Sequence, residues 1–529
     1  MGIYFNPDND SFKKDKNSEL YLDKTGLLEY LNRVICTNAN CISVSHARRF
    51  GKSHAAGMID AYYSRGCDSS ELFQDTEIST RAGYYEHMNK YNVIHIDVSS
   101  FWDVYKDNII EKIQEYICDE LRQVYSDQID YTKMISVVLM SVYKITGIPF
   151  VIIIDEWDCV IRNGGNKELV HNYLQFLHLL FKSEESKAFL ALAYITGILP
   201  IKKIKDESAL NNFREFTMIK SRQLTRFFGF TEEEVKNLCV AYHMDFDSVK
   251  AWYNGYLIDG IHMYNPNSVV QAMLDQDFDF YWKNTSSFES INTFINMNYA
   301  GLKDDVLSML TGEKVRVNVN TFQNDLTTVA SKDDALTALI HLGYLAYDAQ
   351  NQRAYIPNYE VAAAFDLALQ TGSWSEIAKS ISRCDELLDA TIEGDADKVA
   401  ELVGIAHETY TSILKYNDEN SLSCVLTMAY FTASAYYNIV RELPAGRGFA
   451  DLAFIPRANA GGRPALLVEL KYNESADSAI RQIKDQRYSG VLGGYSDKIM
   501  LIGINYNKDG KEKKKHTCVI ESVNDSLDF

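Results

Sequence analysis

The sequence predicts an α/β protein that passes through a mainly helical stretch into a second α/β unit. In the first half, short runs of continuous apolar residues alternate with helical segments, which is typical of a parallel sheet buried on both faces. After about residue 405, strand-like and helix-like segments alternate again. A chain of 529 residues is long enough for several domains. We expect four parts, at 1–205, 206–287, 288–404 and 405–529.

Composition narrows the class of protein. Apolar residues make up 46% and charged residues 24%, as in ordinary globular proteins, and no apolar run is long enough to cross a bilayer. The nine cysteines form no C-x-x-C pair, so neither a disulfide framework nor a zinc knuckle is indicated. A net charge of -19 disfavours general coating of nucleic acid but allows a local basic channel. We expect a cytoplasmic protein with no membrane association.

A strand, a tight loop and a helix are expected over residues 40–63. The loop places Gly51, Lys52 and Ser53 at the strand-to-helix junction, where the phosphate-loop pattern G-x-x-x-x-G-K-[ST] ends. Such a glycine allows close backbone approach, the lysine compensates phosphate charge, and the serine hydroxyl can bind Mg²⁺. His46 occupies the first glycine position, so an ordinary loop is the alternative.

The strand expected at 150–158 leads four apolar residues into Asp155 and Glu156. This is typical of a strand that ends at a Mg²⁺-linked aspartate. We predict that Asp155 holds the metal through water and that Glu156 orients or deprotonates the attacking water. Because ligands of open α/β sheets bind outside the carboxyl ends of strands, both motifs should meet at one site. Alternatively, the acids only mark where the strand reaches solvent.

Two more strands complete the expected sheet. Residues 93–100 fit a sheet with one strand between the two motif strands. The strand at 189–198 ends near Thr196, which we predict to sense the γ-phosphate. A buried threonine satisfied by the backbone is an equal alternative.

The two middle parts have different patterns. Residues 206–287 are mainly helical and are expected to form a lid, in which Thr231 caps a helix and Glu234 completes a capping box. Residues 336–343 have helical spacing, and 344–358 read as a strand, a polar turn and a strand. This pattern predicts a small helix-plus-hairpin module of winged-helix-like type.

An ordered set of motifs covers nearly the whole chain: "YLDKTGLLEYL", "RRFGKS", "VIIIDEWD", "FFGFTEEEV", "WYNGY", "YNPNSVV" and "YWKNTS". It resembles the AAA-ATPase-like family of bacterial proteins that carry a PD-(D/E)XK nuclease-like domain at the C-terminus. That family usually has Arg-Pro before "RRFGK", where this chain has His46 and Ala47. The resemblance implies nucleotide binding by residues 51–53. It also implies Mg²⁺ or water handling by Asp155 and Glu156.

Asp23 and Lys24 lie in the first of these motifs. Two interpretations are open for them: they close the nucleotide site, or they are a helix cap and a surface charge.

The last part should contain a helix, a strand pair, a helix and a strand, at 420–437, 448–456 with 464–472, 475–492 and 498–506. Glu469 and Lys471 are two apart on one strand and so share a face, and a hairpin can bring Asp451 beside them. Two carboxylates can bind Mg²⁺, and Lys471 would position or activate water. A surface Glu-Lys pair is the alternative, although charges in so apolar a strand are costly without partners.

This unit resembles the PD-(D/E)XK superfamily, whose restriction-endonuclease-like fold it implies. Asp451, Glu469 and Lys471 match its motif residue by residue. Glu419 and Gln482 lie where the superfamily often has auxiliary metal- or phosphate-contacting residues; a helix-capping acid and a solvated amide are the alternatives. A basic edge for phosphate could be formed by Arg481, Lys484 and Arg487.

The sequence therefore predicts ATP binding and hydrolysis in the first part and Mg²⁺- or Mn²⁺-dependent cleavage of DNA, or less favourably RNA, in the last. The alternative is a nucleotide-sensing regulator that hydrolyses nothing and whose last domain binds nucleic acid or protein without cutting. Oligomeric state cannot be read from the sequence.

Overall fold

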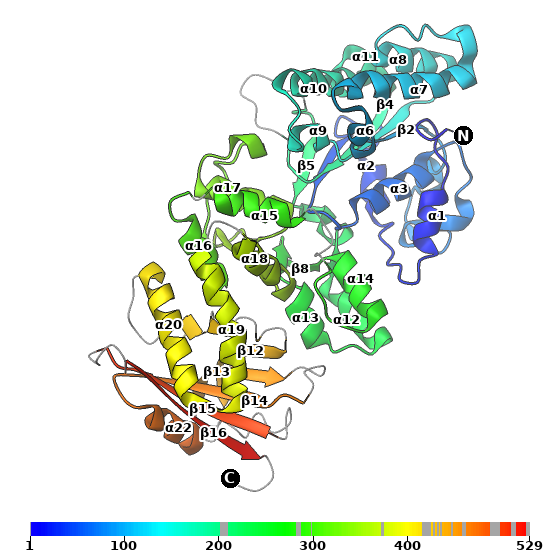
Figure 1. Cartoon of the computed structure of the whole chain (residues 1–529). Helices are drawn as coiled ribbons and strands as arrows, with labels where there is room; N and C mark the ends of the chain where they lie inside the picture. Colours follow the sequence, from blue (N-terminus) through cyan, green and yellow to red (C-terminus); the bar gives the residue numbers. More distant parts are fainter. Residues whose placement is uncertain are drawn as a thin grey trace. The chain divides into compact units, whose positions relative to one another are not determined.

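The computed structural model describes residues 2–201, 210–281, 287–297, 299–310, 312–371, 375–414, 425–426, 429–430, 433, 436–445, 448–456, 462–486, 498–508 and 515–524. The chain divides into two compact units (Figure 1). The first comprises Met1–Trp282 and Lys314–Val361, and the second comprises Lys283–Glu313 and Ala362–Phe529. The four-part division expected from the sequence stays a prediction.

The first unit is built on a five-stranded sheet with the order β2-β3-β4-β1-β5. Its strands are all parallel where they pair, and they are β1 (Cys41–Ser45), β2 (Asn92–Asp97), β3 (Phe150–Asp155), β4 (Leu190–Gly197) and β5 (Arg214–Thr217). The carboxyl ends of β1, β3 and β4 therefore meet at one edge, and this arrangement brings the two motifs together.

Helices cover both faces of this sheet because alternate strand residues point to opposite sides. On β3, Ile152 and Ile154 pack in one buried cluster, while Val151 and Ile153 pack in another. Figure 1 shows α7, α8, α10 and α11 grouped on one side. The helices of this part are α1 (Asp10–Lys16), α2 (Leu27–Val34), α3 (Lys52–Tyr63), α4 (Ser70–Phe73), α5 (Tyr84–His87), α6 (Val98–Tyr105), α7 (Ile109–Tyr125), α8 (Ile135–Thr146), α9 (Cys159–Arg162), α10 (Lys167–Lys182) and α11 (Glu184–Phe189).

Two details of the sheet differ from the sequence-based prediction. One strand does separate β1 from β3, but it is β4, and the segment predicted at 93–100 forms the edge strand β2 and then turns into α6. Asp97 ends this strand by accepting a hydrogen bond from the Ser99 N–H, which starts the helix. The segment predicted to be mainly helical also supplies β5, which pairs with β1.

Along the chain, three helices and a small sheet follow β5. The helices are α12 (Glu232–Tyr242), α13 (Phe246–Tyr253) and α14 (Pro266–Asp275), and the sheet contains β6 (Phe230–Thr231), β7 (Tyr256–Ile258) and β8 (Ile261–Tyr264) in the order β6-β8-β7. The predicted capping box is present, with Thr231 and Glu234 each accepting from the other residue's backbone.

The helix-plus-hairpin prediction is also confirmed. Helix α17 (Lys332–Leu342) ends at Gly343, whose left-handed backbone caps it. Strands β10 (Ala346–Asp348) and β11 (Arg353–Tyr355) form the antiparallel hairpin, and β9 (Val315–Arg316) adds a third strand.

The second unit contains a five-stranded mixed sheet with the order β12-β13-β14-β15-β16. Only β14 and β15 pair in parallel. The strands are β12 (Tyr437–Ala445), β13 (Gly448–Pro456), β14 (Ala465–Tyr472), β15 (Lys498–Tyr506) and β16 (His516–Asn524). The sequence predicted β13, β14 and β15 but neither outer strand.

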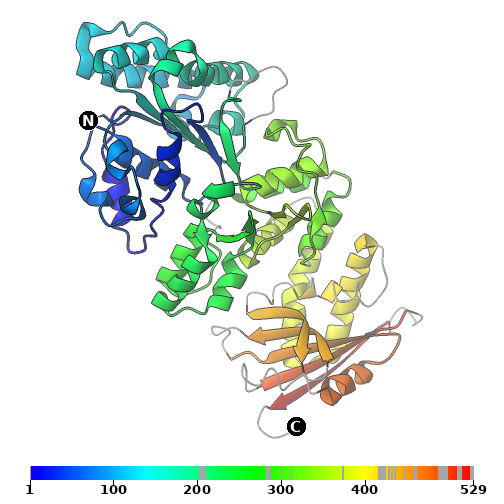
Figure 2. The ribbon, with the colours of Figure 1, turned by 180° about the vertical axis from the view of Figure 1, so that it is seen from behind.

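Helices lie on both faces of this sheet. Figure 2 shows the orange to red strands in front of the yellow helices α19 (Ser375–Glu393) and α20 (Ala396–Leu414). Helix α22 (Ala476–Asp485) packs on β14 and β15 through Ile480 and Ile483. The remaining helices near this unit are α15 (Ser287–Asn296), α16 (Leu302–Leu310) and α18 (Tyr359–Thr371), the last of which crosses the boundary between the units. In the described part of the chain, no helix has the length and apolarity to span a membrane.

Candidate active sites

The loop between β1 and α3 turns into the helix at Gly51. Gly51 caps α3 in the left-handed region with φ of 84°, a conformation that glycine adopts without strain. A side chain at this position would meet no atom within 4 Å, so the space beside the loop is open. Ser53 is exposed in the first turn of the helix, where free backbone N–H groups favour an anion.

Lys52 starts this helix and is buried, with 5% of its surface exposed. Its Nζ donates to the Ala47 carbonyl at 3.0 Å, so the side chain lies back across its own loop. Burial lowers the pKa of Lys52, whereas the acidic side chains at the end of β3, Glu156 first, act to raise it. The loop lysine and the acids are therefore electrostatically coupled at one place.

His46 fills the position where the phosphate-loop pattern has its first glycine. Its side chain is fully buried, its Nε2 lies 3.0 Å from the Ser221 Oγ, and its ring packs near Phe50 and Phe228. Burial, together with the positive charge of Lys52, lowers the pKa of His46 to about 3. A neutral, packed imidazole thus takes the place of an open backbone position.

The end of β3 places Asp155 beside the end of β4. Asp155 is 5% exposed, and its Oδ1 accepts hydrogen bonds from the Thr196 hydroxyl and, at 3.0 Å, from the Glu156 N–H. Thr196 is fully buried. Its hydroxyl therefore bonds to a side chain of the candidate metal site, and the backbone does not satisfy it.

Glu156 follows in a left-handed conformation with φ of 53°. Its Oε2 accepts from the Arg162 Nη2 at 2.5 Å, and the Arg162 Nε lies 3.4 Å from the Asp158 Oδ2. Burial raises the pKa of Glu156, while the cations Lys52 and Arg162 oppose this. The predicted general base is thus held by an arginine from α9.

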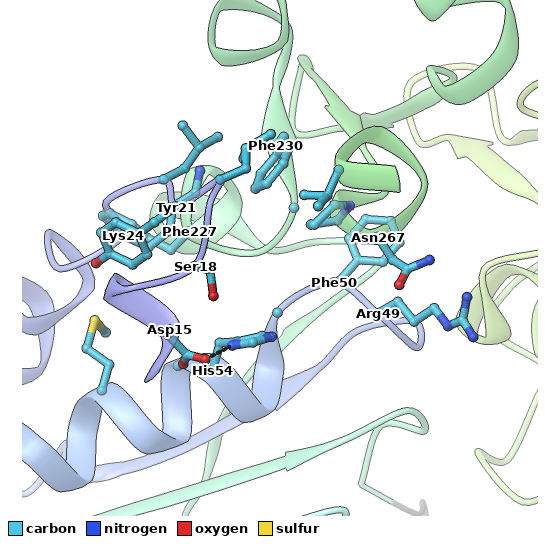
Figure 3. A pocket seen from close by; sticks show the side chains of 18 of the residues that line it. Asp15, Ser18, Tyr21, Lys24, Arg49, Phe50, His54, Phe227, Phe230 and Asn267 are labelled. Atoms are coloured by element: carbon cyan, nitrogen blue, oxygen red, sulfur yellow. Dashed lines mark ion pairs between the residues drawn. The ribbon is translucent and has the colours of Figure 1, made fainter. Parts of the chain in front are cut away.

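A pocket of about 370 Å³ adjoins the loop and lies wholly within the first unit. Figure 3 shows the rings of Tyr21, Phe227 and Phe230 on one wall and the ion pair between His54 and Asp15 on the opposite wall. Gly51 also lines it. A pocket with aromatic walls beside the loop between β1 and α3 has the chemistry to hold a nucleobase.

The structure gives Asp23 and Lys24 separate tasks. Asp23 accepts from the Thr25 N–H at 2.8 Å and from the Glu77 N–H at 2.6 Å, so it caps local backbone. Lys24 lines the pocket, and its Nζ pairs with the Glu234 carboxylate of α12 at 2.7 Å. It therefore joins the pocket wall to the helical part of the first unit.

In the second unit, β13 and β14 bring the three predicted nuclease residues together. The strands are antiparallel, with Leu452 opposite Val468, and this register places Asp451 and Glu469 on one face of adjacent strands. The Asp451 Oδ2 accepts from the Leu470 N–H at 2.7 Å. The Lys471 Nζ lies 3.1 Å from the Glu469 Oε1.

Glu469 is the most buried acid of this group, with 2% of its surface exposed. Burial and, second, the nearby Asp451 carboxylate raise the pKa of Glu469 to about 7, although Lys471 opposes them. Its Oε2 is buried with no hydrogen-bond partner among the described residues. An unpartnered carboxylate oxygen beside a second carboxylate is an arrangement that a cation would stabilise.

Mg²⁺ fits this donor set with a limited number of protein ligands. Within the described part of the chain, no three His, Cys, Asp or Glu side chains gather as a ligand group. Mg²⁺ commonly takes one or two carboxylates and completes its shell with water and phosphate oxygens. Asp451 and Glu469 would be its protein ligands here.

The residues predicted to assist the nuclease site differ in where the structure places them. The Gln482 side chain on α22 donates to the Glu469 Oε1, so it belongs to the site. Arg481 is exposed and its Nε donates to the Asp477 carbonyl of its own helix. Lys484 pairs with Glu521 at 2.5 Å. Glu419 and Arg487 lie outside the described residues.

Sequence reasoning missed two residues of the first site, Asp158 and Arg162. Asp158 is fully buried and accepts from the backbone N–H groups of Ile198 at 3.2 Å and Leu199 at 2.9 Å. The available signal was their spacing: an acid and an arginine four apart are neighbours on a helix.

Comparisons with known proteins agree with this geometry. A family model described as predicted AAA-ATPase matches residues 10–205, and a model of the PD-(D/E)XK nuclease superfamily matches residues 417–516. An uncharacterised protein in the vnfD 5' region of Azotobacter chroococcum mcd 1 is 22% identical over 524 residues, which cover 93% of either chain.

Among solved structures, the Aeropyrum pernix ORC2 protein is 11% identical, with a TM-score of 0.30 over 69% of this chain and 98% of that one. The replication initiator DnaA is 10% identical, with a TM-score of 0.27 over 79% of this chain and 91% of that one. TM-scores of this size carry no argument about fold or ligand. The matches to the two family models support a conclusion. The chain carries an AAA-ATPase-like domain at its N-terminus and a PD-(D/E)XK nuclease superfamily domain at its C-terminus.

Proposed function

We propose that the first unit binds and hydrolyses Mg·ATP and that the C-terminal domain cleaves DNA, in preference to RNA, with Mg²⁺ or Mn²⁺. The observation that carries the nucleotide half is the placement of buried Lys52, at the start of α3, and of Asp155 and Glu156, at the end of β3, at the carboxyl edge of one sheet. Lys52 would contact the β- and γ-phosphates, and Ser53 and Asp155 would hold Mg²⁺. We place this activity in the cytoplasm.

The aromatic pocket supports the choice of a nucleotide over inorganic phosphate. Its rings offer stacking surfaces for a base, and it adjoins Gly51. Thr196 would act on the γ-phosphate through Asp155, since its hydroxyl donates to that carboxylate.

Binding is tested by thermal unfolding of the full chain with and without Mg·ATP. The wild type should be stabilised and Lys52→Ala should not, because that variant loses a charge-assisted phosphate contact. Lys187→Ala is the matched control, since Lys187 is an exposed lysine of the same unit that pairs with Glu184. Equal shifts in wild type and Lys52→Ala would exclude the phosphate-loop assignment.

Hydrolysis is tested with Glu156→Gln, which keeps the size and hydrogen bonding of the side chain but removes the base. It should retain the Mg·ATP thermal shift, and it should turn over ATP about 10²-fold more slowly, or more slowly still. An unchanged rate of ATP turnover would show that Glu156 is not the base.

The nuclease half rests on the burial of Glu469 beside Asp451 and Lys471. Asp451→Asn keeps an oxygen for the Leu470 N–H but loses the charge, so it should lose Mn²⁺ binding by calorimetry and cleavage of DNA. Asp477→Asn, at an exposed acid of α22, is the control. Unchanged Mn²⁺ affinity in Asp451→Asn would show that the acids have a structural role only. Cleavage assays with RNA beside DNA test the substrate preference.

A regulator that senses nucleotide without hydrolysis is the second candidate. It is favoured by one observation: the Glu156 carboxylate is already bound to Arg162 at 2.5 Å. ATP binding without turnover in the presence of metal and DNA would support it.

A further inference from the structure

The backbone that follows β3 is fixed on three sides. The Trp157 N–H donates to the Thr196 carbonyl at 2.9 Å, and the Tyr173 hydroxyl donates to the Trp157 carbonyl at 2.9 Å. Asp158 accepts from the N–H groups that follow β4. This turn is therefore a rigid support for the side chains of the site, and precise positioning of such side chains requires one.

The Glu156 side chain extends from this turn and is 21% exposed. Its carboxylate is bound by Arg162, whose own side chain is 8% exposed. Arg162 is in turn bound by Asp158, which is 1% exposed. A guanidinium that contacts two carboxylates has little rotational freedom, because its donors lie in one plane.

We infer that Arg162 is a positioning residue that holds the Glu156 carboxylate at the carboxyl edge of the sheet and takes its own place from Asp158. This inference rests on the proposed function of Glu156 as the base that acts on the attacking water. A continuous path of contacts runs from the backbone after β4 through Asp158 and Arg162 to the Glu156 oxygen. Misplacement of a reacting group by about 1 Å can reduce a rate by about 10²-fold.

Space around the turn supports this assignment. A Cβ atom at Gly197 would lie 2.7 Å from the Asp158 Oδ1 and 2.9 Å from the Trp157 ring. The end of β4 is therefore packed against the residue that holds Arg162. The charged groups around Glu156 are the acids Asp155 and Asp158 and the cations Lys52 and Arg162. Of the two cations, Arg162 contacts the Glu156 carboxylate directly, at 2.5 Å.

The test is a double-mutant cycle of ATP turnover on the full chain with Arg162→Gln and Glu156→Gln. Arg162→Gln should lower kcat about tenfold or more and leave KM and the Mg·ATP thermal shift nearly unchanged. Combined with Glu156→Gln, Arg162→Gln should lower kcat little further, because the carboxylate that Arg162 positions is already gone. Arg162→Lys should restore part of kcat, since lysine can still contact one carboxylate.

Arg122→Gln is the control, because Arg122 also pairs with an acid in this unit but is exposed on α7. Additive losses in the cycle, or a kcat that is unchanged or raised in Arg162→Gln, would overturn the inference. If Arg162→Gln does not fold, Asp158→Asn, which keeps an acceptor for the backbone N–H groups, should show the same non-additivity. No effect of Glu156→Gln alone would instead refute the proposed function, so the two failures are distinguishable.

Discussion

Replacing Glu469 by glutamine tests the electrostatics of the candidate nuclease site before any substrate is known. Burial, followed by the charge of Asp451, raises the pKa of Glu469 from 4.5 to about 7. The folded protein therefore keeps a proton between these pH values that the unfolded chain releases. The stability that this carboxyl contributes is fully present below pH 4.5 and is lost as pH rises through about 7.

The size of this effect follows from the shift. Each pKa unit corresponds to about 1.4 kcal/mol, so a rise from 4.5 to about 7 makes up to about 3 kcal/mol of the free energy of unfolding depend on pH. Glu469→Gln cannot lose this proton. Relative to wild type, the variant should therefore gain up to about 3 kcal/mol between about pH 4.5 and about pH 7.

Urea unfolding in the presence of a chelator measures this difference, with the transition of the second unit followed separately because a chain of two units need not unfold in one step. Any constant cost of the new amide cancels in the comparison across pH. Glu474→Gln, at an exposed acid of the same unit, is the control for replacing a carboxylate by an amide. A difference between Glu469→Gln and wild type that stays constant with pH would refute the reasoning.

Two other predictions concern the first unit. Gly197→Ala should lower the free energy of unfolding by about 1–3 kcal/mol through overpacking, and should slow ATP turnover, because the new methyl group meets Asp158. An unchanged free energy of unfolding would show that the turn adapts to the methyl group. Asp15→Asn should lower the pKa of His54, because the hydrogen bond that the His54 imidazole donates to the Asp15 carboxylate raises that pKa most. Titration of the histidine ring protons by NMR measures this, with exposed His262 as the unaffected control.

Local patterns in the sequence predicted the parts of the site that local chemistry determines. The strand that ends in Asp155 and Glu156 needed only a run of apolar residues followed by acids. The turn at Gly51 was predicted from the Gly-Lys-Ser triplet and its position between a strand and a helix. Glu469 and Lys471 share a face because side chains alternate along any strand.

What the sequence did not predict depends on pairing between distant segments. Strand β5 has only four residues (Arg214–Thr217) and becomes recognisable through its pairing with β1. The place of β2 at the sheet edge follows from the crossover connections, which no local pattern encodes. Arg162 lies in a helix of a single turn, so its role could emerge only from the placement of Glu156 and Asp158.

The alternation of the two units along the chain has a consequence for synthesis and truncation. Residues 283–313 belong to the second unit, but residues 314–361, which come later, complete the first. A ribosome therefore releases part of the second unit before the first has all of its residues, and the first cannot finish folding until about Val361 has emerged. A fragment that begins near residue 405 would lack α15, α16 and α19, so the full chain is the proper material for measuring nuclease activity.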